Sequence, residues 1–332
     1  MVSSSLFPDS GPRLVGIARM AVHEEPIRDG HQVEYFKLPV RSVLSRCKSA
    51  RVSFEWTINP YRGCEFACKY CYARYTHEFM EMRNGVDFEQ KIYVKQHAAE
   101  LLRQELCQVK PGEFISIGAA TDPFQPAERR YEVTRAILGE LARHKGLQIG
   151  LITKSNLVLR DVDLLQEISR NNRLSVTLTI TTLDVDLARI LEPRAPRPDL
   201  RLGAVRQLID SGIHAGVSCC PVMPAITDSP RNLESLVQAT VEAGGHYIFA
   251  NPLFLKPCSS AVFMPFLEEK FPQLVAAYRA RYKDRAFLPK TYHQRIAQLM
   301  TKLRQKHGMI RGERKLEQLP PVLQSETQMK LF

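Results

Sequence analysis

Three cysteines stand at close, unequal spacing in the stretch from residue 54 to residue 76. Cys64 and Cys68 are separated by three residues, and Cys68 and Cys71 by two. At about 100° per residue, steps of four and three bring the three thiols onto one narrow arc of a coiled segment. Three thiolates that converge in this way indicate a metal centre.

The number of thiols favours one kind of metal centre. A structural zinc site uses four protein ligands, usually in two separated pairs, but this triplet has only His77 as a nearby imidazole and no fourth cysteine close by. A cubane iron–sulfur cluster has four irons, each taking one outside ligand. Three cysteines would leave one iron open to a substrate. The residues favour the cluster, and the alternatives are a zinc site and a purely structural role of the thiols.

The surrounding sequence resembles a known family. Cys-x3-Cys-x2-Cys, with Tyr70 just before the last cysteine, is similar to the cluster motif of the radical S-adenosylmethionine (SAM) superfamily. Three stretches between about residues 50 and 255 resemble the branch related to spore photoproduct lyase: Asn59-Pro60-Tyr61-Arg62-Gly63-Cys64, Thr121-Asp122-Pro123-Phe124-Gln125-Pro126 and Glu192-Pro193-Arg194-Ala195-Pro196.

This resemblance implies a radical enzyme. It would hold one [4Fe-4S] cluster through Cys64, Cys68 and Cys71, and SAM at the open iron. One electron, from a donor such as flavodoxin or ferredoxin, would cleave SAM. The resulting 5′-deoxyadenosyl radical would abstract hydrogen from a substrate. The implied fold is α/β, the partial (β/α)6 TIM-type barrel of the superfamily.

The resemblance also implies contacts to SAM at the carboxyl ends of the strands. Tyr70 is expected near the adenine. Lys154 is expected at the carboxylate or ribose, with an exposed lysine at the start of a loop as the alternative. Many superfamily members hold the SAM amino group with a Gly-Gly-Glu-like segment after the second strand. Asp122 stands in that stretch here and is the candidate acceptor. Thr177 and Thr179 are the candidates from the fourth strand.

Two further candidates follow the later strands. Arg194 lies with Glu192 in a proline-rich loop, where they suit contact with SAM or substrate, or form an ordinary surface ion pair. In spore photoproduct lyase, a cysteine just before the Thr/Ser-Asp pattern returns hydrogen to the substrate. This sequence has alanine there, so a different reaction is expected. Cys219 and Cys220 are candidate hydrogen donors, although buried cysteines are more often small core residues.

Strand and helix patterns alternate through the middle of the chain and would position these residues. Phe54, Trp56 and Ile58 alternate with polar residues, which predicts a strand ending just before the cysteines. Further strands are expected at 92–94, 114–118, 147–152, 174–181, 215–222 and 247–251, and helices at 75–83, 98–106, 134–146, 161–169, 199–212 and 232–242. This alternation predicts a parallel sheet. On the fourth barrel strand, 174–181, the aliphatic face is expected toward the helices and the hydroxyl face toward the interior.

The sequence is divided into three parts by pattern and charge. Residues 1–52 are expected to be a loosely packed N-terminal extension, 53–256 the barrel, and 257–332 a helical basic region with helices at 265–282 and 290–306. The net charge is +11. Twelve basic residues and only two acidic ones stand between Arg279 and Lys315.

The basic region also carries aromatic residues, which are Tyr278, Tyr282, Phe287 and Tyr292. Cations for phosphates and rings for bases suit a single-stranded nucleic acid. The alternative is a solvated helix whose rings pack on the barrel. A third reading is a radical SAM enzyme acting on a protein or small metabolite, and a reading from another class is a nucleic-acid-binding protein with a structural metal.

The composition also bears on the compartment. No apolar run is long enough to span a membrane, and no signal peptide is expected from the first twelve residues. Eight cysteines in 332 residues, three of them in a metal spacing, favour the reducing cytoplasm over a disulfide-bonded framework.

Overall fold

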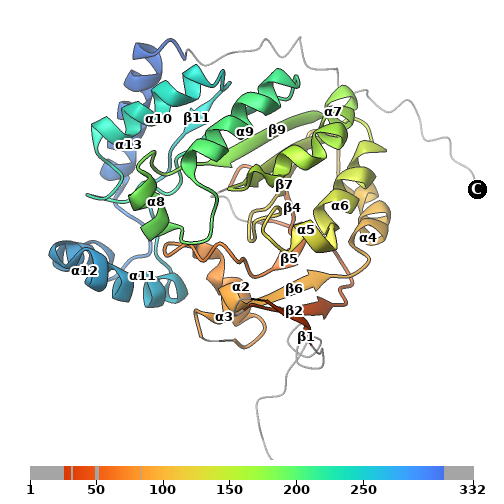
Figure 1. Ribbon diagram of the computed structural model, residues 1–332, viewed down its shortest axis with the longest axis horizontal. Helices are drawn as coiled ribbons and strands as arrows, with labels where there is room; N and C mark the ends of the chain where they lie inside the picture. The colour runs from red at the N-terminus through yellow and green to blue at the C-terminus, as the bar shows by residue number, and fades with distance from the viewer. Residues whose placement is uncertain (1–25, 31–32, 49–51, 83, 310–332) are drawn as a thin grey trace, which may run out of the picture.

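The computed structural model describes residues 26–30, 33–48, 52–82 and 84–309, and a seven-stranded sheet forms its centre (Figure 1). Six strands pair in parallel and in chain order: β4 (Trp56–Ile58), β7 (Phe114–Ile117), β8 (Gln148–Thr153), β9 (Arg173–Thr179), β10 (Ala215–Ser218) and β11 (Ile248–Phe249). β3 (Leu44–Arg46) pairs antiparallel with β4 at one edge. The expected α/β class and parallel sheet are confirmed, in an arrangement consistent with a partial barrel.

Helices join the parallel strands and lie around the outside of the sheet (Figure 1). They are α4 (Ala98–Glu105), α5 (Glu128–Tyr131), α6 (Val133–Ala142), α7 (Val162–Asn171), α8 (Val185–Leu191), α9 (Pro198–Asp210) and α10 (Pro230–Glu242). Three 3-10 turns accompany them: η1 (Tyr72–Arg74), η2 (Leu106–Gln108) and η3 (Asn156–Asp161). Apolar side chains of α6, α7, α9 and α10 pack with strand residues in the main core, as parallel sheets require.

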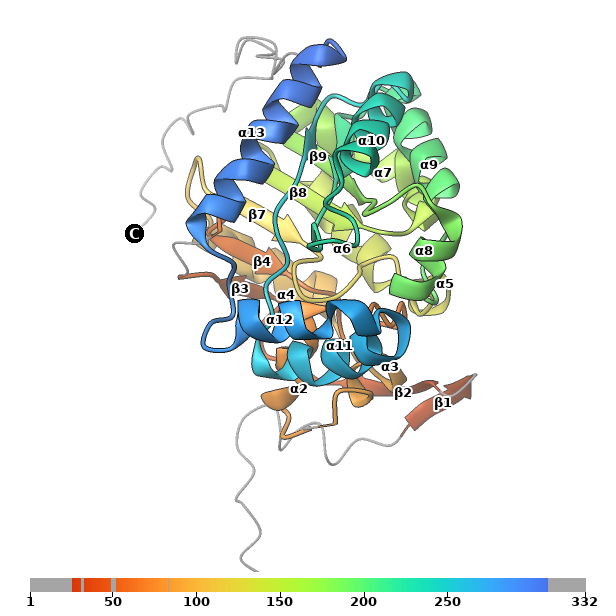
Figure 2. The same cartoon turned by 90° about the vertical axis from the view of Figure 1, so that its left-hand side faces the viewer.

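A second, smaller sheet lies below the first and is formed mostly by the N-terminal part of the described chain (Figure 2). Its order is β1 (Pro26–Gly30), β2 (Val33–Leu38), β6 (Lys91–Lys95) and β5 (Tyr61–Arg62). β2 runs parallel to β6, and β3 pairs with β4. The expectation of loose packing is therefore wrong for residues 33–38 and 44–46, because their strands pair with others in the two sheets. Residues 1–25 lie outside the described chain, and the boundaries of the three parts stay predictions.

The C-terminal helices gather on one side of the seven-stranded sheet. α11 (Pro257–Lys270) and α12 (Val275–Tyr282) lie beside α2 (Tyr75–Glu78) and α3 (Asp87–Gln90), and α13 (Lys290–Lys306) packs along α10 (Figures 1 and 2). The predicted helix at 290–306 is confirmed. The predicted single helix at 265–282 is wrong, because the chain breaks at η4 (Pro272–Leu274), where proline cannot continue the hydrogen-bond ladder.

Strand β9 shows how the core is divided. Leu174, Val176 and Leu178 belong to the main apolar core together with residues of α7 and α9. Thr177 and Thr179, which alternate with them, are also buried. The strand therefore buries an aliphatic face and a hydroxyl face, as the alternation predicts.

Some predicted helix ends differ from the observed ones. The helix at 75–83 ends at Glu78. Asp199 does not cap α9, because Pro198 occupies the first helical position and Arg197 precedes it. Thr134 lies within the first turn of α6 and donates its hydroxyl to the Pro123 carbonyl. Within the described residues, no helix combines the length and apolarity needed to cross a bilayer.

Candidate active site at the three-cysteine loop

The loop that carries the cysteines leaves β5 through a tight backbone approach. Gly63 has φ +82°, and a Cβ atom there would lie 2.7 Å from the Lys91 carbonyl oxygen and 2.9 Å from that of Phe88. One residue later, the Cys64 N–H donates to the Phe88 carbonyl at 2.9 Å. Only glycine tolerates both this φ and this contact. The first cysteine is thus fixed against α3 and β6.

The three thiols lie near one another, and none is in a disulfide. Cys64 and Cys68 are buried and Cys71 is half-buried. Burial raises the pKa of the Cys64 thiol well above its ordinary value, and the nearby Asp122, Cys68 and Cys71 raise it further. Burial likewise raises the pKa of Cys68 to about 12. Thiols in this environment become thiolates only when a cationic partner replaces the proton, as a metal does.

Segments far away in sequence hold the rest of the loop. The Lys69 N–H donates to the Leu191 carbonyl at 3.0 Å. The Ser259 hydroxyl of α11 donates to the Cys71 carbonyl at 3.2 Å. The Tyr72 hydroxyl donates to the Ala119 carbonyl, after β7. The backbone that follows strands β7 and β9, together with one C-terminal helix, therefore fixes the loop on three sides.

Side chains of the stretch Thr121 to Gln125 hydrogen-bond to the backbone of the cysteine loop. The Thr121 hydroxyl donates to the Gly63 carbonyl at 2.6 Å, and the Gln125 amide donates to the same oxygen at 3.2 Å. In return, the Gln125 side-chain oxygen accepts the Glu65 N–H at 3.0 Å. The residues that carried part of the family resemblance thus have a structural role beside the cysteines.

A buried ion pair lies next to the Tyr70 hydroxyl. Glu192 and Arg201 are each about 1% exposed, and their charged groups are 2.5 Å apart. Tyr70 donates its hydroxyl to Glu192. Although burial alone would raise the pKa of Glu192, Arg201 and Lys154 hold it below its ordinary value. The alternative of an ordinary Glu192–Arg194 surface pair is wrong, because Glu192 is turned inward to Arg201.

Arg201 was not among the predicted site residues. It also donates to the carbonyls of Pro196, at 2.7 Å, and Thr179, at 2.9 Å. It therefore links the loop after α8 to the end of β9. Its burial in α9 could not be predicted from the sequence, because arginines in helices are mostly solvent-exposed.

Lys154 and Asp122 meet where β8 ends. The Lys154 ammonium lies 5.6 Å from the centre of the Tyr70 ring. Burial would lower the pKa of Lys154, but Cys68 and Glu192 raise it above its ordinary value. Asp122 accepts three hydrogen bonds, from the Thr153 hydroxyl at 2.6 Å, the Lys154 N–H at 2.7 Å and the Phe124 N–H at 2.9 Å. Its carboxylate is thus largely engaged in positioning Lys154, which leaves little capacity for the expected contact with a SAM amino group.

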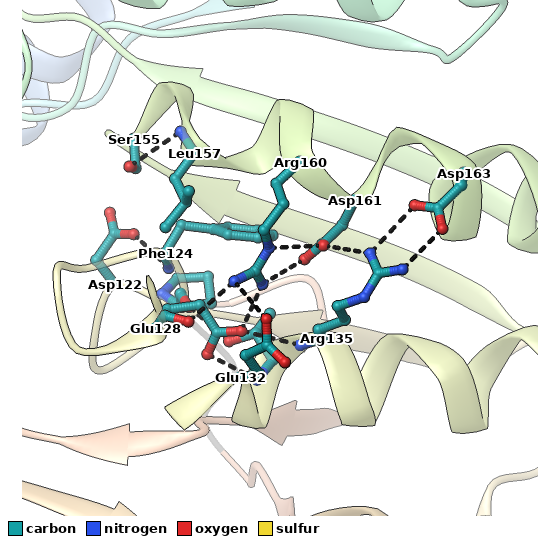
Figure 3. A network of polar contacts seen from close by, with 12 residues as sticks. Asp122, Phe124, Glu128, Glu132, Arg135, Ser155, Leu157, Arg160, Asp161 and Asp163 are labelled. Carbon is teal, nitrogen blue, oxygen red and sulfur yellow. Dashed lines mark hydrogen bonds and ion pairs between the residues drawn. The ribbon is translucent and has the colours of Figure 1, made fainter. Parts of the chain in front are cut away.

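An ionic network fixes the segment between β7 and α6, on which Asp122 lies (Figure 3). Arg160, on η3, pairs with both Glu128 and Asp161 at 2.8 Å. Arg135, on α6, pairs with Asp161 at 2.6 Å and with Asp163 at 2.8 Å. Glu128 and Asp161 are fully buried. The network ties the loop after β7 to the turn after β8, so that the two loops near the thiols keep a fixed relation.

The remaining cofactor candidates differ in how exposed their side chains are. The Thr177 hydroxyl bonds to the Tyr247 hydroxyl at 2.8 Å. The Thr179 side chain is buried next to the Arg201 contact. Arg194 is exposed at the rim, where its N–H donates to the Phe66 carbonyl at 3.3 Å. Of the predicted set, Tyr70, Lys154 and Asp122 gather around the thiols.

The structure separates the two candidate hydrogen donors. Cys219 is 1% exposed and belongs to the apolar core. Cys220 is half-buried, near Ser218, Asn251 and Lys154. Of the two cysteines, Cys220 is thus the one that lies among polar groups.

A row of aromatic rings that the sequence analysis did not place at the site runs outward from Tyr72. Tyr72 contacts Phe254 with ring centres 5.2 Å apart, and Phe254 stacks on Phe287 at 5.1 Å. The backbones of Phe254 and Phe287 also form a bridge, and the Leu255 N–H donates to the Ala286 carbonyl at 2.8 Å. The loop between α12 and α13 is thereby attached to the chain after β11, next to the residue that follows Cys71.

Comparison with known proteins identifies the family. The profile described as the Radical SAM superfamily matches residues 58–236, more than half of the chain. This protein belongs to the radical SAM superfamily. It is a radical SAM enzyme, and its cofactors are a [4Fe-4S] cluster and SAM.

Relatives of similar length are uncharacterised. The chain is 33% identical over 300 residues to an uncharacterised protein of Mycobacterium tuberculosis, covering 89% of this chain and 87% of that one. It is 28% identical over 242 residues to an uncharacterised protein of Methanocaldococcus jannaschii, covering 73% and 85%. A structure of spore photoproduct lyase with bound AdoMet (SAM) and dinucleoside spore photoproduct has a TM-score of 0.61 at 15% identity, covering 82% of this chain and 79% of that one. That likeness shows a shared fold.

The donor set fits the cluster better than a single zinc ion. Within the described ranges, no three His, Cys, Asp or Glu side chains are arranged as ligands of one metal ion. Zinc with bonds of about 2.3 Å to sulfur would bring the sulfurs to roughly 3.8 Å from one another. In a cluster, each thiolate binds its own iron, so three neighbouring thiols need not close around one point.

Proposed function

We propose that this radical SAM enzyme abstracts hydrogen from a nucleotide within a nucleic acid, in a reaction related to that of spore photoproduct lyase but with a different hydrogen donor. The observation that supports the substrate class is the attachment of the α12–α13 loop beside the cysteine loop. Arg281, Lys283 and Arg285 are exposed in or next to this loop. Cations for phosphates, next to the aromatic row of Tyr72, Phe254 and Phe287, match what single-stranded nucleic acids require.

In this proposal Cys64, Cys68 and Cys71 would hold the cluster. Tyr70, Lys154, Thr177, Thr179 and Arg194 remain our candidates for contact with SAM, and Asp122 acts mainly by positioning Lys154. When bound, the two cofactors supply a 5′-deoxyadenosyl radical that removes a hydrogen atom from the substrate. Flavodoxin or ferredoxin would deliver the electron.

The residues around the thiols have definable tasks. Lys154 brings a positive charge next to Cys68, where it suits a carboxylate of a bound ligand. Glu192 and Arg201 hold Tyr70 between the second and third cysteines. The Tyr72 and Phe254 rings and α11 contact the loop and cover part of it. Cys220 offers a thiol that can return a hydrogen atom to the substrate radical. The thiyl radical left on Cys220 would take one electron from flavodoxin or ferredoxin and one proton from solvent to restore the thiol.

The test begins with anaerobic reconstitution with iron and sulfide, followed by dithionite and SAM and measurement of 5′-deoxyadenosine. Cys68→Ala is expected to abolish product and lower bound iron, whereas Cys107→Ala, at an exposed cysteine outside the site, should change neither. A protein that takes up zinc without sulfide, or that binds iron but never cleaves SAM, would contradict the proposed chemistry.

The substrate class has its own test. Single-stranded DNA and RNA are expected to stimulate formation of 5′-deoxyadenosine, with binding that weakens as salt rises. Cys220→Ala is expected to slow product formation on a nucleic acid, whereas Cys219→Ala should act through stability alone. Stimulation by peptides or small metabolites, with no salt-dependent binding of oligonucleotides, would refute the nucleic-acid proposal.

A further inference from the structure

A depression of about 420 Å³ lies apart from the cysteine loop, where three segments meet. Its lining residues come from the loop after β10, from α12 and from α13: Ala225, Asp228, Arg281, Thr291, Tyr292 and Arg295. The volume is within the range of small-ligand sites. The question is which chemistry these side chains would recognise.

Arg295 lines the depression and pairs with Asp228 at its edge. Its guanidinium bonds to Asp228 at 2.9 Å and lies 4.9 Å from the centre of the Tyr292 ring. The Tyr292 hydroxyl donates to the same carboxylate oxygen at 2.8 Å, and the Ala225 N–H donates to the other at 2.7 Å. Asp228 therefore accepts three hydrogen bonds, and its charge is compensated by Arg295.

Arg281 supplies the charge that remains. It is exposed on the last turn of α12, and among the residues the structure describes no acidic side chain forms an ion pair with it. Two guanidiniums against one carboxylate leave the depression with an excess of one positive charge. The Thr291 hydroxyl adds a hydrogen-bond donor. Planar guanidiniums with a hydroxyl donor match the oxygens of a phosphate group.

The depression is connected to the barrel interior through one loop. That loop begins at Cys219 and Cys220, and its Met223 packs in the same apolar cluster as Cys64 and Cys68. The Pro224 carbonyl accepts the Tyr278 hydroxyl at 2.8 Å, which fixes the loop to α12. Ala225 and Asp228 then line the depression. This loop therefore joins the lining of the depression to the residues that pack beside the thiols.

We propose that this depression binds a phosphodiester group of the nucleic-acid strand whose nucleotide enters the barrel. The inference rests on the proposed function. A phosphate held by Arg281, Arg295 and Thr291 would fix the register of the strand without reading its sequence, because phosphate contacts position and base contacts specify. A free phosphate or mononucleotide has the same chemistry and is separated from the strand by the experiment.

The experiment measures binding of a fluorescent single-stranded oligonucleotide to the reconstituted protein by anisotropy over a salt series. Arg281→Gln is expected to weaken binding and to lower the slope of log affinity against log salt by about 0.7, the value for one lost phosphate contact on a single strand. Lys302→Gln is the matched control, because it removes one exposed charge from α13 outside the depression. Arg295→Gln is expected to lower the slope by a similar amount, since it removes the second guanidinium that lines the depression.

The outcomes separate this inference from the proposed function. Loss of slope in Lys302→Gln as large as in Arg281→Gln, or no loss of slope in Arg295→Gln, would overturn the pocket while leaving nucleic-acid binding intact. Inorganic phosphate or a nucleoside monophosphate that binds the wild type through Arg281, with oligonucleotide binding unaffected by Arg281→Gln, would assign the site to a free ligand and overturn the strand proposal. A wild type that shows no salt-dependent binding of oligonucleotides would refute both proposals together.

Discussion

Removal of Arg201 tests how the Tyr70 position is maintained. Arg201 and Glu192 are each about 1% exposed, so Arg201→Met leaves a carboxylate inside the protein without its closest partner. Breaking a buried pair from one side costs about 3–5 kcal/mol, because the remaining charge is uncompensated. The carbonyls of Thr179 and Pro196 also lose their donor. We expect a loss of about 3–5 kcal/mol in the free energy of unfolding, near the upper end if Lys154 cannot move closer to Glu192.

The same helix provides the control. Arg197 pairs with Asp199 at 3.0 Å, but both side chains are 54% exposed. An exposed pair contributes about 0–1 kcal/mol, so Arg197→Met should be nearly neutral. The double variant Glu192→Leu/Arg201→Met removes both buried charges and is expected to recover most of the stability. It still leaves the Tyr70 hydroxyl without its acceptor, which costs about 1–3 kcal/mol.

The assay is urea unfolding of the reconstituted protein, followed by circular dichroism, with the midpoint compared at unchanged slope. Bound iron is measured on the same samples, because a displaced Tyr70 should disturb the loop between Cys68 and Cys71. A loss below about 1 kcal/mol in Arg201→Met would show that water reaches the pair and would refute the reasoning. So would a double variant that is less stable than Arg201→Met.

Two further predictions concern the chain around the cysteine loop. Burial lowers the pKa of His77 from 6.5 to about 4, so the folded state favours the neutral ring. The free energy of unfolding is therefore highest above pH 6.5 and should fall by about 2 kcal/mol from pH 7.5 to pH 5. His77→Gln should reduce this pH dependence, and an unchanged pH dependence in the variant would disprove the burial argument. Gly63→Ala should cost at least about 2 kcal/mol in unfolding free energy and lower bound iron, because it adds a Cβ clash to an unfavourable φ. Gly112 has a similar φ of +88° but nothing within 4 Å of an added Cβ, so Gly112→Ala should show the cost of φ alone, about 1 kcal/mol. Equal losses of stability in the two variants would count against the clash at Gly63.

Many helices and strands of the fold could be predicted from local sequence patterns. The alternation in β9 and the helical spacing of α13 are properties of neighbouring residues, and both were predictable. The small sheet was not, because β2 and β6 are more than fifty residues apart and their pairing depends on how the chain folds back. Pairing between distant strands leaves no periodic signal in a sequence.

In the site, too, local features were predictable and contacts between distant residues were not. The cysteine spacing and the position of Lys154 after a strand were sufficient to predict a cluster of functional groups at that end of the sheet. The pairing of Glu192 was not, because Arg201 is nine residues away and lies in a helix whose other charges face water. The role of Asp122 also depended on its three donors, which come from two different loops.

The contact between Ser259 and the Cys71 carbonyl has a consequence for biosynthesis. These residues are 188 positions apart, so the cysteine loop leaves the ribosome long before α11 can cover it. Iron and sulfide could reach the thiols freely during that interval, and oxygen could as well. Once α11 has folded onto the loop, access narrows for both. The order in which the chain is made therefore sets a period in which the apoprotein can be loaded and is also most vulnerable to oxidation.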